Sequence, residues 1–127
     1  MKEKNTVFYK CQTRGNLIGL IAGNINNMAC CGQKMERLDA NSVDAAHEKH
    51  VPVYEKDGDE IVVRVGQVEH PMEKEHYIMW IAMVSDNQTT RIRLYPEQET
   101  TVRFKYIPQS TLYAYCNKHG LWKAEVK

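Results

Sequence analysis

Short runs of β-branched and aromatic residues recur after residue 50, and clusters of turn residues separate them. Val51–Glu55 and Glu60–Val65 lie on either side of Lys56-Asp57-Gly58-Asp59, and an Asp-Gly pair between two such runs is a strong hairpin signal. Tyr77–Val84 and Thr89–Tyr95 flank a second cluster of turn residues in the same way. The pattern therefore predicts antiparallel hairpins.

Two further strands are expected toward the C-terminus. Thr100–Ile107 alternates apolar with charged residues, as a half-buried strand does, and Ser110–Cys116 follows after Pro108. Little helical periodicity is present, although Ser42–Lys49 could form a short helical turn. About six or seven short strands at regular spacing predict a mostly β fold, a seven-stranded immunoglobulin-like antiparallel β-sandwich.

The chain has a different character before residue 38. This part is punctuated by glycine and asparagine and holds three of the four cysteines. The change of pattern predicts a boundary near residue 38, between a small domain in residues 1–37 and the sandwich in residues 38–127.

Composition narrows the classes of function. The 127 residues carry a net charge of only +1, which argues against a nucleic-acid-binding protein. The apolar stretch Leu17–Ala22 is far shorter than the roughly 20 residues that a membrane helix needs, and it lacks the flanks of a secretory signal. We therefore expect a cytoplasmic protein. In that reducing compartment the cysteines should be ligands or free thiols rather than disulfides.

Four of the five histidines stand where loops meet strands, at His50, His70, His76 and His119. A single surface histidine is usually inert, but a sandwich gathers the ends of its strands. Cys116 precedes His119 with two residues between them, so both side chains could bind one ion from a tight turn. Four imidazoles and a thiolate favour a five-coordinate metal with one open position. That arrangement is expected for redox chemistry on a small oxygen species.

Five runs occur in an order and spacing that resemble one known family across roughly residues 30–124: Glu48–Val53, Val68–Met72, Glu75–Ile78, Trp80–Ile81 and Tyr115–Trp122. They are similar to the superoxide reductases of the desulfoferrodoxin/neelaredoxin family. The resemblance implies one mononuclear non-haem iron per chain, Fe2+ or Fe3+. Its implied ligands are His50, His70, His76 and His119, with Cys116 as the axial thiolate. The fifth histidine, His47, falls outside the pattern.

The resemblance also implies roles for the two residues before His50. Lys49 would lie near the open coordination position and attract superoxide, and Glu48 would occupy that position once the iron is ferric. Taken alone, the pair would be read as a solvated charge pair. The implied activity is one-electron, inner-sphere reduction of superoxide to hydrogen peroxide, without production of dioxygen.

The first domain resembles desulforedoxin, whose iron is held by a Cys-x-x-Cys and a later Cys-Cys pair. Here Cys11 is followed by Arg14 in place of the second cysteine, while Cys30 and Cys31 remain. Arginine cannot ligate a metal and would repel one. Three thiolates can still hold zinc with a fourth ligand, so a metal at this place is left open. The resemblance favours a one-iron form in which this degenerate domain is structural, with a homodimer and a rubredoxin-like electron donor as expected partners.

Two other classes of protein compete with this interpretation. A cupredoxin-like copper electron-transfer protein is also a β-sandwich with a late cysteine and histidine, but it usually has a methionine soon after the last histidine. No methionine follows His119 in this chain, and two histidines would be unexplained. A sandwich binding module with scattered histidines and an incidental zinc is the other alternative.

Overall fold

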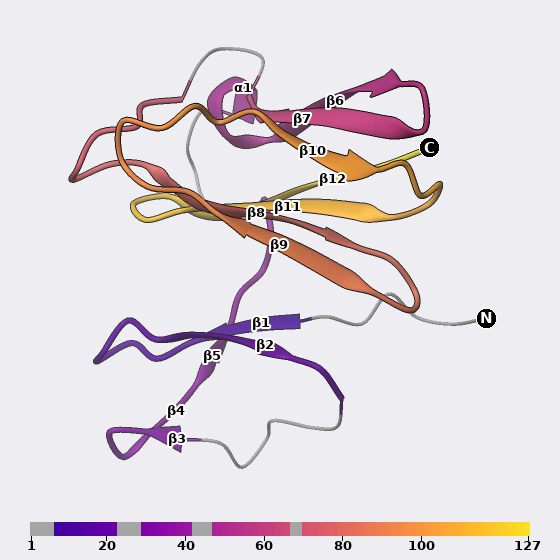
Figure 1. Cartoon of the computed structure of the whole chain (residues 1–127). Helices are drawn as coiled ribbons and strands as arrows, with labels where there is room; N and C mark the ends of the chain where they lie inside the picture. The colour runs from indigo at the N-terminus through magenta and orange to yellow at the C-terminus, as the bar shows by residue number, and fades with distance from the viewer. Residues whose placement is uncertain (1–6, 23–28, 42–46, 67–69) are drawn as a thin grey trace.

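Two antiparallel β-sheets packed face to face form most of the chain in the computed structural model (Figure 1). Residues 7–22, 29–41, 47–66 and 70–127 are described, residues 47 and 48 by their backbone alone. One sheet has the order β10-β7-β6 and the other β12-β11-β8-β9. Their bounds are β6 Pro52–Asp57, β7 Glu60–Val65, β8 Ile78–Val84, β9 Thr89–Arg93, β10 Val102–Lys105, β11 Thr111–Cys116 and β12 Gly120–Glu125.

The hydrophobic core lies between these two sheets. Ile61 and Val63 of β7 face Ile81 of β8 and Leu112 of β11, and all four side chains are fully buried. The mostly β fold predicted from the sequence is confirmed. The expected helical segment is seen only as one turn, α1 (His47–His50), and the rest of the Ser42–Lys49 prediction lies outside the described residues. No helix in the described part of the chain is long and apolar enough to span a membrane.

Strand β8 is apolar along its whole length because both of its faces are covered. Ile78, Ile81 and Met83 pack into the core between the sheets, whereas Trp80 and Ala82 pack into a second apolar cluster on the other side. The register between β8 and β11 shifts beside Cys116, which marks a β-bulge or irregularity. A bulge re-aims the side chains that flank it, so Ile78 and Trp80 face opposite ways.

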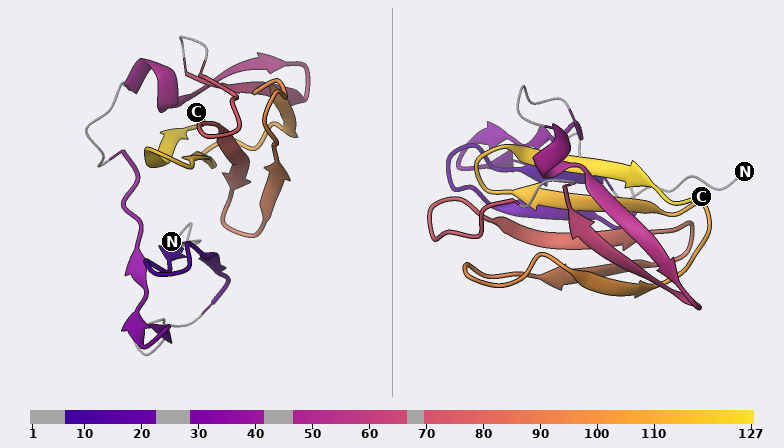
Figure 2. Two further views of the ribbon diagram at one scale, coloured as in Figure 1. Left: turned by 90° about the vertical axis from the view of Figure 1, so that its left-hand side faces the viewer. Right: turned by 90° about the horizontal axis from the view of Figure 1, so that it is seen from above.

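The N-terminal residues form two small sheets that lie beside the sandwich (Figures 1 and 2). β1 (Val7–Lys10) is the middle strand of one sheet, between β2 (Leu17–Leu20) and β5 (Glu36–Arg37). β3 (Ala29–Cys30) and β4 (Gln33–Lys34) form the other. Phe8 of β1 connects this region to the sandwich, since its ring centroid lies 5.0 Å from that of Trp80 and 5.1 Å from that of Tyr113. The division into domains at residues 37 and 38 stays a prediction.

One expectation about the cysteines is wrong. Cys11 and Cys30, expected to be ligands or free thiols, are joined by a disulfide, while Cys31 and Cys116 are free. The cause lies in the fold, because Cys11 follows β1 and Cys30 ends β3. Their Cα atoms are 5.8 Å apart, within the range that a disulfide can bridge.

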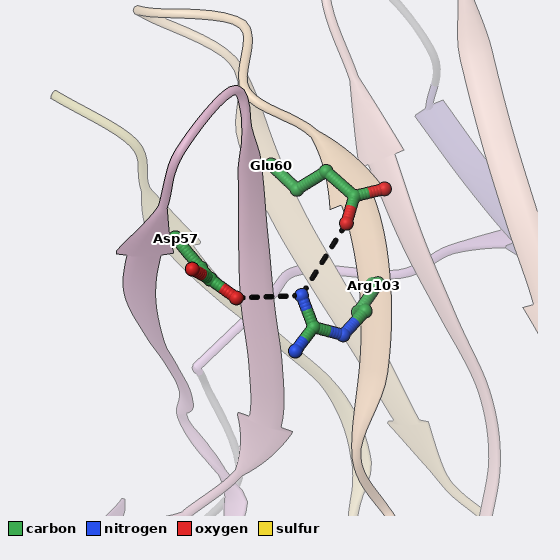
Figure 3. Close-up of polar contacts among 3 residues, drawn as sticks. All are labelled: Asp57, Glu60 and Arg103. Atoms are coloured by element: carbon green, nitrogen blue, oxygen red, sulfur yellow. Dashed lines mark hydrogen bonds and ion pairs between the residues drawn. The ribbon is translucent and has the colours of Figure 1, made fainter.

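The hairpin of β6 and β7 is tied to β10 at its turn, at the end of β7 away from His70. Arg103 donates hydrogen bonds to Asp57 at 2.9 Å and to Glu60 at 3.3 Å (Figure 3). The hydrogen bond with Asp57 is the main cause that raises the pKa of Arg103. All three side chains are about half exposed or more, so water weakens these ion pairs and their effect on stability is small.

Candidate metal centre

Five potential metal donors come together at one end of the sandwich, from four separate parts of the chain. His50 ends α1, His70 and His76 flank a loop before β8, Cys116 ends β11, and His119 lies in the turn before β12. One donor atom from each residue can be chosen so that all lie within 4.8 Å of one another. The structure therefore brings together the five residues that the sequence predicts as ligands.

The four imidazoles are arranged as a square. Going round it, the ring centroids of His50 and His70 are 4.7 Å apart, those of His70 and His76 4.7 Å, those of His76 and His119 5.0 Å, and those of His119 and His50 4.8 Å. The diagonal from His50 to His76 is longer, at 6.5 Å. Neighbouring rings are nearly perpendicular, with interplanar angles of 73° to 84°. Such a ring of imidazoles leaves a central point that several nitrogens can reach.

The nitrogens that face this point require a cation. His70 Nε2 and His76 Nε2 are buried and make no hydrogen bond among the described residues. His50 Nε2 lies 3.1 Å from His119 Nδ1, and Cys116 Sγ lies 4.0 Å from the same atom. Buried nitrogens without a partner are costly, and one metal ion at the centre would satisfy them together. The residues present therefore fit a metal ion.

The backbone fixes how His70 is oriented. His70 Nδ1 lies 2.7 Å from the carbonyl oxygen of Pro71. A ring with its proton on Nδ1 donates to that oxygen and leaves Nε2 free as a ligand, the usual arrangement of a metal-binding histidine. The side chain is also almost completely buried, with 1% exposed.

Asn117 holds the loop of His76 against the turn that carries Cys116 and His119. Its Oδ1 accepts a hydrogen bond from the Tyr77 amide at 2.9 Å, and its Nδ2 donates to the Glu75 carbonyl at 3.0 Å. Its own amide donates to the Tyr77 carbonyl at 3.2 Å. Sequence reasoning missed this residue, although its place between two expected ligands was a possible signal.

Trp122 supports the other side of the ring of imidazoles. Its indole is fully buried and stacks on His50, with ring centroids 4.9 Å apart and planes inclined by 22°. Its Nε1 donates a hydrogen bond to the carbonyl oxygen of His119 at 3.1 Å. One residue therefore positions two of the donors, a role that the sequence motif did not reveal.

Burial disfavours the charged forms of three of the donors, His70, His76 and Cys116. Desolvation lowers the pKa of His70 from 6.5 to about 4, and the neighbouring histidines add to the effect. Desolvation and the positive charge of neighbouring groups also lower the pKa of His76. Burial raises the pKa of the Cys116 thiol, although backbone hydrogen bonds from Lys118 and His119 act in the opposite direction. Neutral imidazoles are the form that binds metals, whereas the thiol must lose its proton to do so.

The three residues before His50 belong to the same helical turn, α1. The Lys49 side chain is exposed, as a residue that meets a diffusing anion must be. Glu48 and His47 belong to α1, but their side chains lie outside the described residues.

Four imidazoles and one buried thiol at the end of an antiparallel β-sandwich define a class, the mononuclear metal proteins with a mixed histidine and cysteine site.

Comparison with known proteins identifies the family within this class. The desulfoferrodoxin family model matches residues 42–125. The desulfoferrodoxin of Syntrophotalea carbinolica is 44% identical over 126 residues, which cover 98% of this chain and 99% of that protein. The crystal structure of the superoxide reductase from Treponema pallidum has a TM-score of 0.74 and 32% identity, and the match covers 94% of this chain and 98% of that one. The superoxide reductase of Pyrococcus abyssi is 38% identical over 100 residues, which cover 63% of this chain and 87% of that protein.

The chain belongs to the desulfoferrodoxin family, and its structural relatives include superoxide reductases. Membership of this family, together with the donor set of four histidines and one cysteine, indicates a non-haem iron centre. The family predicted from the sequence motifs is confirmed.

The pKa of His70 predicts how acid affects the metal-free protein. Because the folded state lowers this pKa to about 4 from 6.5, the unfolded chain takes up a proton first as the pH falls. The free energy of unfolding should therefore decrease as the pH falls from 6.5 toward 4. Urea unfolding of the metal-free protein at several pH values checks this. The decrease should be shallower in His70→Gln, and an equal slope in both proteins would contradict the assignment.

Replacement of Asn117 by alanine should loosen the centre without removing a donor. The Tyr77 amide and the Glu75 carbonyl lose their partner, so the loop of His76 is held less firmly. Loss of a group that orients a ligand typically lowers metal affinity about 10- to 100-fold. Competition with a chelator measures this change. Lys123→Ala, at an exposed position on β12, is the control, and equal affinities in the two variants would argue against the clamp.

Proposed function

We propose that this protein is a superoxide reductase, which reduces superoxide by one electron to hydrogen peroxide and releases no dioxygen. The observation that carries the proposal is the convergence of five donor atoms within 4.8 Å of one another. Two imidazole nitrogens there, His70 Nε2 and His76 Nε2, are buried and have no hydrogen-bond partner within the described part of the chain. The related proteins named superoxide reductase support it. His50, His70, His76, His119 and Cys116 would hold one iron ion per chain.

The iron would supply a one-electron Fe2+/Fe3+ couple and an open coordination position for a small oxygen species. The chain's own residues would make that position selective. Cys116 brings a sulfur that is 0% exposed, and the backbone amides of Lys118 and His119 hydrogen-bond it. Trp122 covers His50 on the inner side with an apolar surface. Substrate and protons would therefore arrive from the side of the centre that is open to solvent.

The two residues before His50 complete the proposed mechanism. Lys49 is exposed and would attract the superoxide anion and stabilise negative charge near the open position. Glu48 would place its carboxylate in the open position once the iron is ferric. The sequence resemblance supports both roles.

Electrons would come from a rubredoxin-like partner, because Arg14 replaces one cysteine of a second iron site in the N-terminal region. Residues 1–37 would then be structural, and a homodimer stays a prediction. A cupredoxin-like copper site is disfavoured, since such a site needs two imidazoles and this centre contains four.

Metal analysis combined with absorption spectroscopy tests the proposed centre. The purified protein should contain about one iron per chain at this five-donor site and, once oxidised, show a visible ferric–thiolate charge-transfer band. Cys116→Ser should lose the band, because the sulfur ligand is removed. Cys31→Ser, which changes an exposed free thiol, is the matched control and should keep it. Copper or zinc in place of iron, or an iron-loaded oxidised protein without the band, would overturn the proposal.

Lys49→Ala should slow the second-order reaction with superoxide about three- to tenfold at low ionic strength. The difference should shrink as salt is added, because exposed charges are screened beyond about 10 Å at 0.1 M salt. Pulse radiolysis at several salt concentrations measures the rates. Lys105→Ala is the control, since Lys105 is exposed and lies opposite Glu60 in the register of β10 with β7, at the far end of β7. Equal rates for Lys49→Ala and the control would remove Lys49 from the mechanism.

A further inference from the structure

A second cluster of sulfur atoms lies in the N-terminal region, built from other residues than the metal centre. Donor atoms of Cys11, Cys30 and Cys31 lie within 4.8 Å of one another. Cys11 and Cys30 are joined by a disulfide, and the free Cys31 Sγ lies 3.9 Å from Cys30 Sγ. A free thiol therefore lies close to a disulfide, which is the basic requirement of thiol–disulfide exchange.

Accessibility differs sharply between these sulfurs. Cys11 is 1% exposed, whereas Cys31 is an exposed residue. A thiol or disulfide in solution would therefore meet Cys31 first. Cys31 could then exchange with the disulfide of buried Cys11 and half-buried Cys30.

The backbone at Cys31 is that of a tight turn in which cysteine is unusual. Cys31 and Gly32 connect β3 to β4, where Cys30 pairs with Gln33. Both connecting residues have positive φ, 53° at Cys31 and 77° at Gly32. Two-residue hairpin turns of this kind favour asparagine or glycine at the first position. A cysteine there is strained, and strain of this kind is typical of functional sites.

Arg14 supplies a positive charge to the cluster. Its Nε donates a hydrogen bond to Cys31 Sγ at 3.3 Å, and its backbone amide donates to Cys11 Sγ at 3.4 Å. A metal cation at this place would meet the like charge of the guanidinium. A thiolate at Cys31, the nucleophilic form of cysteine, would meet an opposite charge. The contacts therefore favour sulfur chemistry over metal binding.

We propose that Cys11, Cys30 and Cys31 form a thiol–disulfide exchange site that reacts with small thiols and disulfides. In the internal step the Cys31 thiolate attacks Cys11 Sγ, the bond between Cys11 and Cys30 breaks, and Cys30 leaves as a thiolate that takes a proton from water. In the external step the Cys31 thiolate attacks a small disulfide, forms a mixed disulfide and releases one small thiolate. Two small thiols can also reduce the protein disulfide and become a disulfide themselves, which balances two electrons and two protons.

Disulfide mapping of the full-length, iron-loaded protein tests the internal step. The protein is kept anaerobically in buffers of reduced and oxidised glutathione, acid-quenched, denatured and labelled with N-ethylmaleimide before digestion without reductant. The wild type should contain both a Cys11–Cys30 and a Cys11–Cys31 disulfide, with some glutathione on Cys31. Cys30→Ser should form Cys11–Cys31 alone, and Cys116 should be labelled in every sample as an internal reference.

The role of Arg14 is tested by the rate at which oxidised glutathione modifies Cys31. Arg14→Gln removes the charge but keeps the backbone amide that donates to Cys11 Sγ, and it should slow the reaction roughly fivefold. Arg14→Lys should restore much of the rate. Lys34→Gln, which removes an exposed cation from the neighbouring strand β4, is the control and should react as the wild type does.

Three results would overturn the proposal. One is a protein in which all cysteines are labelled even in oxidised glutathione, since no disulfide then exists. Another is a disulfide found only between Cys11 and Cys30, with Cys31 equally reactive in wild type and Arg14→Gln. The third is a second metal ion whose binding is lost in Cys31→Ser. None of these results depends on whether the chain reduces superoxide.

Discussion

The chemistry at one end of the sandwich depends on one constraint. A buried imidazole nitrogen without a hydrogen-bond partner is unfavourable, and a positive charge bound to its lone pair stabilises it. Four rings turn their nitrogens toward one point, and two of these nitrogens have no hydrogen-bond partner among the described residues. Burial disfavours a positive charge on His70 and His76, and it lowers the pKa of both. A metal ion relieves this arrangement in one step, because it accepts every lone pair and favours the thiolate of Cys116. Burial disfavours protonation of His70 and His76, and it thereby leaves their lone pairs available to a metal ion.

The positions of the donors depend on strand β8 and its neighbours. β8 packs on the core with one face and on the N-terminal region with the other, through Trp80 and Phe8. The irregularity beside Cys116 accounts for Ile78 and Trp80, two residues apart, packing into different clusters. Cys116 pairs with Ile78 at that point. The N-terminal sheet thus stabilises β8, the strand that pairs with Cys116. None of the five donors of the centre comes from that sheet.

The parts of this structure that follow from local patterns could be predicted from the sequence. The hairpin of β6 and β7 was predicted because its turn chemistry and its alternation lie within a short stretch. β12 was not among the strands predicted from the sequence. Its neighbours Leu121 and Trp122 are both buried, on opposite faces, so apolar and polar residues do not alternate there.

Long-range contacts explain what sequence reasoning missed at the sites. The five donors were expected because their residue types are distinctive and they stand at the ends of strands. Asn117 and Trp122 carry no such chemical signature. Asn117 acts through a contact 40 positions away, and Trp122 stacks on His50 at the other side of the centre. The disulfide between Cys11 and Cys30 likewise depends on how β1 and β3 lie, across a sequence separation of 19 residues.

The two free cysteines show how surroundings decide the chemistry of one side chain. Cys116 is buried beside the imidazoles of the metal centre, where a metal cation would be the partner of its thiolate. Cys31 is exposed and already has a cation, the guanidinium of Arg14. That permanent charge disfavours a second metal ion in the N-terminal region and leaves the three sulfurs to react with one another. Both proposals for the N-terminal region therefore rest on Arg14, whose charge would disfavour a second metal ion and favour a thiolate at Cys31.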